Sequence, residues 1–386
     1  MRNSPRRKKL LALARLMNRQ NDPSVFVSDE LIDVFDLVIT DEEADRLLAM
    51  DTPSRTRASV REVSPLPDDA FDAVFKSALE KGLVWMRHDE AGNETYAVAP
   101  ILVGWFEAFL FNGRRTDAQR EFARRVDDLF RYWRRFNVFP IRSLRNLAQR
   151  FSPPHQRVLP AAGKPRTRKI EVNVPINAPP TGVLDSSGVV DLVEQYGAGQ
   201  MIALAHCFCR EWRHMVGESC AMKLPSEACI AIGDFASHVV RYSGGRVIRV
   251  EEAKELVMEL SSKGAVHMVF HERENIRRPE IGICNCCRDC CGVLGSYNRG
   301  VTGLRFRAYR VAMIGDASQC NACARCERFC PTFAIRVGDG GVSLDPGKCI
   351  GCGQCALQCG RGVFTLIEGE RDAILPLLKP SEVNIP

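Results

Sequence analysis

Two cysteine runs near the end of the chain decide its fold: Cys320-x2-Cys323-x2-Cys326-x3-Cys330-Pro331 and Cys349-x2-Cys352-x2-Cys355-x3-Cys359. The second run repeats the spacing of the first at an offset of 29 residues. Between them, two short apolar stretches at 334–337 and 342–344 flank a glycine-rich turn, which predicts a β-hairpin. A single run is compatible with chance or with a zinc site. Two runs in register are specific for iron–sulfur ligation.

The doubled run resembles a bacterial-type two-[4Fe–4S] ferredoxin domain. In that family the first three cysteines of a run bind one cluster and the fourth binds the other. The resemblance therefore implies two [4Fe–4S] clusters with crossed ligand sets. One set is Cys320, Cys323, Cys326 and Cys359, and the other is Cys349, Cys352, Cys355 and Cys330. The apolar residues expected to shield the clusters from water are Ala322, Ala324, Ile335, Ile350, Ala356, Leu357 and Val363.

The composition limits the class of protein. A chain of 386 residues, 45% hydrophobic and 26% charged, is typical of a soluble protein with two or three domains. The chain has seventeen cysteines, and its first residues show no signal-peptide pattern. Together these features indicate metal ligation in a reducing cytoplasm. The longest apolar stretch, 101–111, contains Glu107 and is too short to span a bilayer. We therefore predict a cytoplasmic protein without a transmembrane segment.

The front of the chain predicts a basic segment, 1–35, followed by a winged-helix-like and helical docking domain at 36–151. Helices are predicted from Thr40 to Leu48, at 57–63 and from Asp68 onward, where Asp68 is the expected cap. Strands at 83–86 and 95–98 would form the wing. The third helix is rich in acidic residues, which repel phosphate, so DNA is not expected as a partner.

Two stretches of this front region are rich in arginine and lysine. Residues 1–20 predict a short amphipathic helix that either contacts an acidic partner or is a solvated basic end. Residues 113–151 predict a long helix or a helical pair in which arginines alternate with aromatic residues. The alternatives there are nucleic-acid binding, contact with an acidic redox partner, or packing on the body of the protein. Packing is the favoured interpretation. The proline-rich stretch 152–184 predicts a connector with one strand at 169–174.

The other nine cysteines lie in a predicted Cys-rich metal-binding domain at 185–316: Cys207, Cys209, Cys220, Cys229, Cys284, Cys286, Cys287, Cys290 and Cys291. Buried strands are predicted at 201–205 and 266–270, with helices at 185–195, 233–242 and 251–262. We expect each strand to deliver a cysteine group to one end of a sheet. Such dense thiols suit a further iron–sulfur cluster, a zinc ion, or free redox-active thiols. Arg210 and Arg288 are candidate hydrogen-bond donors to cluster sulfurs.

Taken together, these segments are similar to a family of multidomain bacterial and archaeal 4Fe–4S dicluster proteins. The resemblance rests on Cys207-x-Cys209-Arg210, on two spaced cysteines, and on the run Ile283-Cys284-Asn285-Cys286-Cys287-x2-Cys290-Cys291 before the doubled run. It implies an α+β protein with a winged-helix-like N-terminal domain and a Cys-rich α/β middle domain. The dicluster ferredoxin-like domain would occupy 317–370, followed by a tail at 371–386.

The leading functional hypothesis is an electron-transfer protein that relays low-potential electrons between a redox partner, such as a flavoprotein or reductase, and an acceptor. One alternative is a redox-sensing transcriptional regulator with a winged helix. Another is an iron–sulfur oxidoreductase whose active site is the Cys-rich middle domain, with no catalytic residue assigned. The sequence contains no P-loop, dinucleotide fingerprint or radical-SAM cysteine triplet, so nucleotide-cofactor chemistry would come from a partner.

Overall fold

The computed structural model describes residues 4–19, 25–51, 54–65, 67–89, 91–138, 140–151, 156–159, 188–271 and 281–385. They form a mixed α+β arrangement in two compact units, each built from separate stretches of chain. Unit 1 comprises Met1–Tyr132, Ala203–Ser219 and Ser226–Val247; unit 2 comprises Trp133–Ile202, Cys220–Pro225 and Ile248–Pro386. The predicted strand at 169–174 and most of the proline-rich connector lie outside the described residues. The six-part division of the chain stays a prediction.

Unit 1 is mainly helical, and three elements at its limits fall in it for most of their residues. Its elements are α1 (Pro5–Asn18), α2 (Asp29–Val38), α3 (Asp41–Met50), α4 (Arg57–Val63), α5 (Asp68–Glu80), β1 (Val84–His88), β2 (Glu94–Val98), a π-helical turn (Ile101–Trp105), α6 (Phe106–Leu110), α7 (Asp117–Arg134), β4 (Ile202–His206), α10 (Phe208–Met215), β5 (Glu227–Ile232), α11 (Asp234–Tyr242) and β6 (Arg246–Ile248). β1 and β2 form an antiparallel hairpin, and β5, β4 and β6 are neighbours in that order.

The basic N-terminal segment folds as the expected amphipathic helix, but its charges are not left to solvent. Leu10, Leu13 and Met17 of α1 are buried in unit 1. On the other face, Arg7 pairs with Asp33 of α2 at 2.6 Å and Lys9 pairs with Asp45 of α3 at 2.8 Å. Acidic residues of the same unit therefore neutralise much of the positive charge of α1.

The predicted three helices and hairpin are present in unit 1. The Thr40 hydroxyl accepts from the Glu43 amide at 3.2 Å, and the Glu43 carboxylate accepts from the Thr40 amide at 2.9 Å. This reciprocal capping box starts α3 where the sequence predicts it. The expected capping role of Asp68 is wrong, because Pro67 occupies the cap position and Asp68 is the first helical residue. The order of elements suits a winged helix, which stays a prediction.

The arginine-rich helix α7 packs on the body of unit 1. Phe122, Val126 and Leu129 are fully buried on one of its faces. On the other face Glu121 pairs with Arg124 and Arg125 at 2.7 and 3.0 Å. The favoured interpretation of the interleaved aromatic residues as a packing face is therefore confirmed for α7.

Unit 2 contains the sheet to which the cysteine-rich segments belong. Its elements are α8 (Ile141–Gln149), β3 (Gln156–Leu159), α9 (Val189–Gly197), α12 (Val250–Ser262), β7 (Val266–His271), β8 (Ile281–Cys286), α13 (Leu294–Asn298), β9 (Leu304–Ile314), a 3-10 turn (Ala317–Gln319), α14 (Arg325–Phe329), β10 (Ile335–Gly338), β11 (Gly341–Leu344), α15 (Gln354–Gln358), β12 (Phe364–Leu375) and a second 3-10 turn (Pro380–Glu382). Within unit 2 the strand order is β12-β9-β3-β7-β8.

One premise about the middle cysteines is wrong. Cys284 and Cys286 were expected in a loop beyond the carboxyl end of the strand at 266–270. They lie instead on β8, which is antiparallel to β7 and pairs Cys286 with Val266. Cys286 is thus beside the beginning of β7, because an antiparallel partner runs back toward the first residue of its neighbour.

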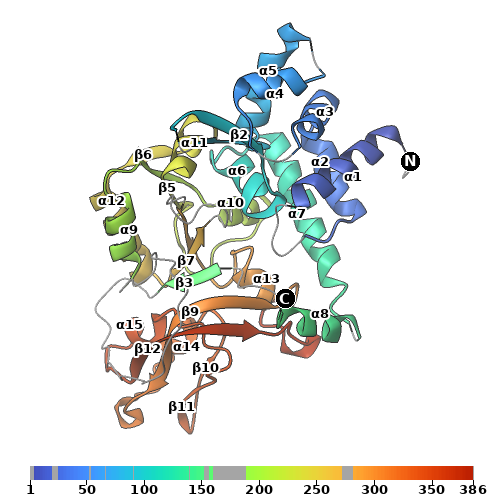
Figure 1. The fold of residues 1–386 in the computed structure, drawn as a ribbon. Helices are drawn as coiled ribbons and strands as arrows, with labels where there is room; N and C mark the ends of the chain where they lie inside the picture. The colour runs from blue at the N-terminus through green and yellow to red at the C-terminus, as the bar shows by residue number, and fades with distance from the viewer. Residues whose placement is uncertain are drawn as a thin grey trace. The chain divides into compact units, whose positions relative to one another are not determined.

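The doubled cysteine run is placed between two long strands. β9 and β12 pair antiparallel and are the long orange and red strands of Figure 1. Between them in sequence come α14, the predicted hairpin of β10 and β11, and α15. No helix among the described residues combines the length and the apolar character needed to cross a membrane.

Candidate metal centres

The first ligand set gathers around Cys326. Its thiol lies close enough to those of Cys359, Cys320 and Cys323 for electrostatic interaction, so the fourth cysteine of the second run joins the first three of the first run. Burial, followed by these neighbouring thiols, raises the pKa of Cys326 to about 11. A ligating thiolate must therefore lose a proton that the metal-free protein holds at neutral pH.

The second ligand set lines a single small pocket. Its walls include Cys330 from the first run and Cys349, Cys352 and Cys355 from the second. The remaining wall is mostly apolar. This donor set suits an iron–sulfur cluster, because four thiols line one pocket and each can serve one iron. Burial raises the pKa of Cys330, Cys352 and Cys355.

The backbone repeats along with the cysteines. Three positions in and just after the first run have positive φ, and the residues 29 positions later have it too: Ala322 and Gly351 (56° and 72°), Ala324 and Gly353 (55° and 77°), and Phe333 and Gly362 (53° and 68°). A left-handed residue turns the chain sharply. The backbone of each half therefore makes the same three turns at the same positions relative to its cysteines.

Backbone amides donate to several of these sulfurs. The Ala322 amide donates to Cys320 Sγ at 3.4 Å, and the Ala334 amide donates to Cys330 Sγ at 3.2 Å. Such donors stabilise negative charge on sulfur and raise the potential of a bound cluster.

The two ligand sets differ in exposure. Cys323 is exposed, and Cys320 and Cys359 are half-buried. All four cysteines of the second set are buried. The expectation that Ala322 shields the first set is wrong, because its backbone turn leaves Ala322 exposed. The other predicted shielding residues are buried or half-buried.

Comparison with known proteins settles the kind of domain these sets form. Residues 312–360 match the family described as the 4Fe–4S dicluster domain. The C-terminal region of this chain is a 4Fe–4S dicluster domain. It is therefore an iron–sulfur-binding region of the ferredoxin type, as the sequence predicts. The match covers the doubled run and the hairpin between the two halves, and not the front or middle of the chain.

Two curated proteins share similarity with part of the chain. An uncharacterized ferredoxin of Methanocaldococcus jannaschii, MJ0265, is 34% identical over 92 residues, which are 24% of this chain and 55% of that protein. The putative oxidoreductase UacF of Escherichia coli is 32% identical over 93 residues, 22% of this chain and 14% of that protein. The chain thus spans about half or less of the length of each relative. No solved structure matches it.

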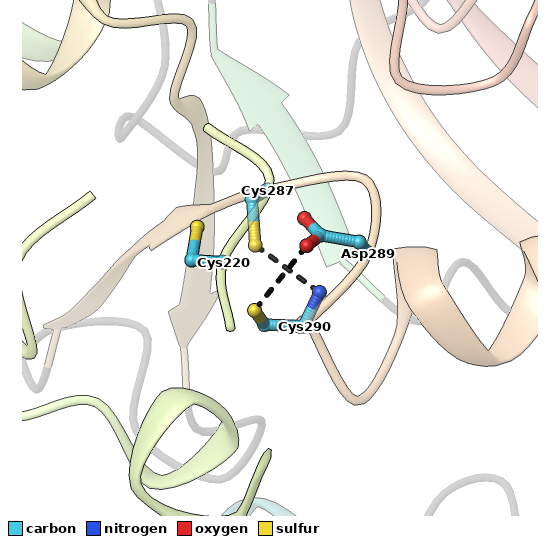
Figure 2. Close-up of side chains that lie close together, drawn as sticks. All are labelled: Cys220, Cys287, Asp289 and Cys290. Carbon is cyan, nitrogen blue, oxygen red and sulfur yellow. Dashed lines mark hydrogen bonds between the residues drawn. The ribbon is translucent and has the colours of Figure 1, made fainter. Parts of the chain in front are cut away.

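The nine middle cysteines belong to both units. Cys207, Cys209 and Cys229 belong to unit 1, where Cys207 is the cap residue of α10 and Cys229 lies on β5. In unit 2, Cys286 contacts Cys284 and Cys291. Also in unit 2, Cys220 lies with Cys287, Asp289 and Cys290 (Figure 2). No disulfide joins any of the seventeen cysteines, all of which the structure describes.

Arg288 and His267 make contacts other than with cysteine sulfur. The Arg288 guanidinium, a predicted donor to cluster sulfur, lies over the Phe333 ring, 4.8 Å from its centroid. Arg210 is buried in unit 1. His267 is buried between Ser261 Oγ at 2.5 Å and Asn285 Oδ1 at 2.6 Å.

Two polar residues that the sequence did not single out connect the dicluster domain to the middle region within unit 2. Asn298, which is fully buried, donates to the carbonyl oxygens of Arg288 at 2.8 Å and Pro331 at 2.9 Å. Gln354 donates to the carbonyl oxygens of Ser261 at 3.1 Å and Ala265 at 2.7 Å. Asparagine and glutamine have no distinctive spacing, so only the fold can identify them.

Proposed function

We propose that this chain is an electron-transfer protein with two [4Fe–4S] clusters, which relays low-potential electrons between a redox partner and an acceptor. The observation that carries the proposal is the convergence of two four-thiol sets in one domain, one reaching the surface and one buried. Each bound cluster would supply a one-electron redox centre. Cys320, Cys323, Cys326 and Cys359 would hold the first, and Cys330, Cys349, Cys352 and Cys355 the second.

The difference in exposure supports a direction for partner contact. Because Cys323 is exposed, the first ligand set can come close to another protein. The second set is shielded, and burial disfavours the more negative reduced state, which lowers a potential. We therefore propose the first set as the contact point for a flavoprotein or reductase and the second as the inner relay.

A shared hydrophobic core supports a route from the inner set toward the middle region. Cys352 of the inner set belongs to one buried cluster with Cys286 and Cys291, and Ile350 lies in the same cluster. The Asn298 hydrogen bonds fix the loop after Cys330 relative to the loop that contains Arg288. We propose that the thiols of Cys284, Cys286 and Cys291 belong to a further centre at the inner end of this route.

The names of the two relatives, a ferredoxin and a putative oxidoreductase, are compatible with this role. The front region, with its winged-helix-like order of elements, would serve to contact a protein partner. On the basis of the high cysteine content, we also propose a cytoplasmic location.

Single-cysteine variants test the order of the two sets. Cys323→Ala should convert or remove the outer cluster while the inner one stays. Under anaerobic stopped-flow mixing with a reduced flavoprotein donor, reduction of the remaining cluster should then slow at least tenfold. Cys355→Ala should instead spare fast reduction of the outer cluster. Asp339→Asn, on the exposed hairpin turn, is the control. Equal reduction rates in all four proteins would contradict the proposed route.

A further inference from the structure

A compact group of four side chains in unit 2 stands apart from both dicluster ligand sets. We propose that Cys220, Cys287, Cys290 and Asp289 form a closed binding site for a single zinc ion. This goes beyond the proposed electron-transfer role, because zinc has no redox chemistry. The site would hold two distant stretches of chain together.

The spacing of the ligand atoms fits one ion. One ligand atom from each of the four residues lies within 4.8 Å of all the others. A tetrahedral zinc site with Zn–S near ~2.3 Å and Zn–O near ~2.1 Å separates its ligand atoms by roughly 3.6–3.8 Å. The Cys290 sulfur and Asp289 Oδ2 are 3.6 Å apart. Little movement is therefore needed to close the shell around an ion.

The same spacing argues against a cubane at this place. A cubane binds its four ligands through four different irons, so its thiolates lie further apart than those of one ion. Among the residues that the structure describes, neither dicluster ligand set gathers three or more ligand atoms within 4.8 Å, whereas the Cys220 group does. The two kinds of site thus differ within one chain.

The local backbone resembles that of zinc-binding turns. Cys287 and Cys290 have the C-x2-C spacing common in structural zinc sites. The Cys290 amide donates to Cys287 Sγ at 3.3 Å, a bond that steadies a thiolate. Figure 2 shows Cys287, Asp289 and Cys290 converging within this turn, with Cys220 beside them from the other segment.

The Asp289 carboxylate is oriented and incompletely satisfied. Its Oδ2 accepts from the Ala221 amide at 2.6 Å, which joins positions 68 residues apart. Its Oδ1 is shielded from solvent and has no hydrogen-bond partner among the described residues. A buried carboxylate oxygen without a partner is costly, and a cation would offset that cost.

The proposed site shares no thiol with the neighbouring group, because Cys286 makes its contacts with Cys284 and Cys291. Three thiolates and one carboxylate fill a tetrahedral shell, which leaves no position for substrate and is typical of structural zinc. Binding would couple the segment 220–225 to the turn 287–290 and so stabilise unit 2.

The test uses the full-length protein, purified anaerobically from cells supplied with iron and zinc. We expect one zinc per chain in addition to the cluster iron. Extended X-ray absorption fine structure at the zinc edge should show about three sulfur ligands at ~2.3 Å and one oxygen ligand at ~2.1 Å. Asp289→Asn and Cys290→Ser should each lower zinc affinity by at least tenfold with iron and sulfide unchanged. Asp339→Asn should change neither metal.

Three results would overturn the proposal: no zinc in the unaltered protein, zinc unchanged in both variants, or a loss of iron and sulfide in Asp289→Asn with zinc retained. If Cys290→Ser is insoluble, Asp289→Asn alone decides, since it keeps the size of the side chain. Because iron and sulfide are measured separately, failure of the zinc site is distinguishable from failure of the dicluster assignment.

Discussion

The left-handed turns of the cysteine repeat are occupied by different residues in its two halves. The second run has glycine at all three positions, whereas the first has Ala322, Ala324 and Phe333. A side chain in this conformation costs roughly 1 kcal/mol, and glycine avoids the cost. The first half therefore keeps the fold with some backbone strain.

Exchanging alanine and glycine between the halves should have opposite effects. A Cβ on Gly351 would lie 2.0 Å from the Arg310 carbonyl oxygen, in addition to the strained φ. Gly351→Ala should destabilise the protein by about 2 kcal/mol or more and lower the iron content. Ala322→Gly should be neutral or stabilising by up to about 1 kcal/mol. Anaerobic urea unfolding with iron analysis distinguishes them; equal effects would refute the steric argument.

A buried histidine in unit 1 should make stability depend on pH. His238 accepts the Met86 amide at 3.2 Å, and burial followed by the charges of Arg87 and Arg241 lowers its pKa to about 3. Since the unfolded histidine has a pKa near ~6.5, the contribution of His238 is complete above that pH and is lost as pH falls toward 3. Between pH 7.5 and 5.5 it should remove about 1.4 kcal/mol of unfolding free energy.

His238→Gln tests this pH dependence, because glutamine does not titrate. Urea unfolding of both proteins at the two pH values should show a shallower decline for the variant. An equal decline of the unfolding free energy in both proteins would show that groups other than His238 cause the acid sensitivity.

At the residue scale the sequence singles out candidate ligands where spacing carries the signal. The cysteine runs are such a case, because a [4Fe–4S] cluster needs four thiols at set intervals. Asp289 is one of 47 acidic residues and has no interval of its own. Only its position between Cys287 and Cys290 could have indicated a ligand role.

Among the elements, helix α15 is fixed to the end of α12 by side-chain amides. Gln354, which is fully buried, donates to two carbonyl oxygens, and Gln358 donates to that of Ser262 at 3.0 Å. These carbonyls belong to the last turn of α12 and the residues after it, where a helix leaves carbonyl oxygens without its regular amide partners. That of Ser261 also accepts from the Gly264 amide at 2.9 Å. The glutamines therefore align the inner ligand set with the middle region.

Gln354→Leu should remove both hydrogen bonds and leave the Ala265 carbonyl oxygen without this donor, while that of Ser261 keeps the Gly264 amide at 2.9 Å. We expect a loss of about 1–3 kcal/mol in unfolding free energy. The inner cluster should also lose iron faster under a chelator than in the unaltered protein. Gln195→Leu, at an exposed position on α9, is the control. Identical chelation rates in both variants would show that the amide contacts do not hold the cluster region.

Elements with strong local signals were predictable, such as α3 with its capping box and the hairpin of β10 and β11. The strand β8 was not, because Ile281–Cys286 contains two cysteines and suggested a ligand loop. Its strand conformation comes from pairing with β7, a non-local contact. The tertiary partner, and not the local sequence, decided that segment.

At the scale of the whole molecule, the chain crosses more than once between its two units. Residues 203–219 and 226–247 fold in unit 1, while the six residues Cys220–Pro225 fold in unit 2. Sequence patterns divide a chain into contiguous domains, so this alternation between the units could not be predicted from them. It also means that a fragment such as 170–316 would cut both units, and full-length protein is the suitable material for metal analysis.

The front region should bind DNA weakly and without sequence preference. Arg7 and Lys9 of α1 are paired with acids of α2 and α3, which makes them less available to phosphate. Fluorescence anisotropy with duplex DNA at ~150 mM salt should give a Kd in the micromolar range or weaker. A nanomolar complex that depends on DNA sequence would instead support the transcriptional-regulator alternative.

The central claim is that two four-thiol sets hold two [4Fe–4S] clusters for electron transfer. The most direct measurement is iron and acid-labile sulfide per chain in anaerobically purified full-length protein, before and after Cys323→Ala. The account predicts about eight iron and eight sulfide from the dicluster domain, with the variant losing no more than about four of each. Tetrahedral zinc at these cysteines with no sulfide, or loss of all cluster iron from a folded Cys323→Ala protein, would contradict it.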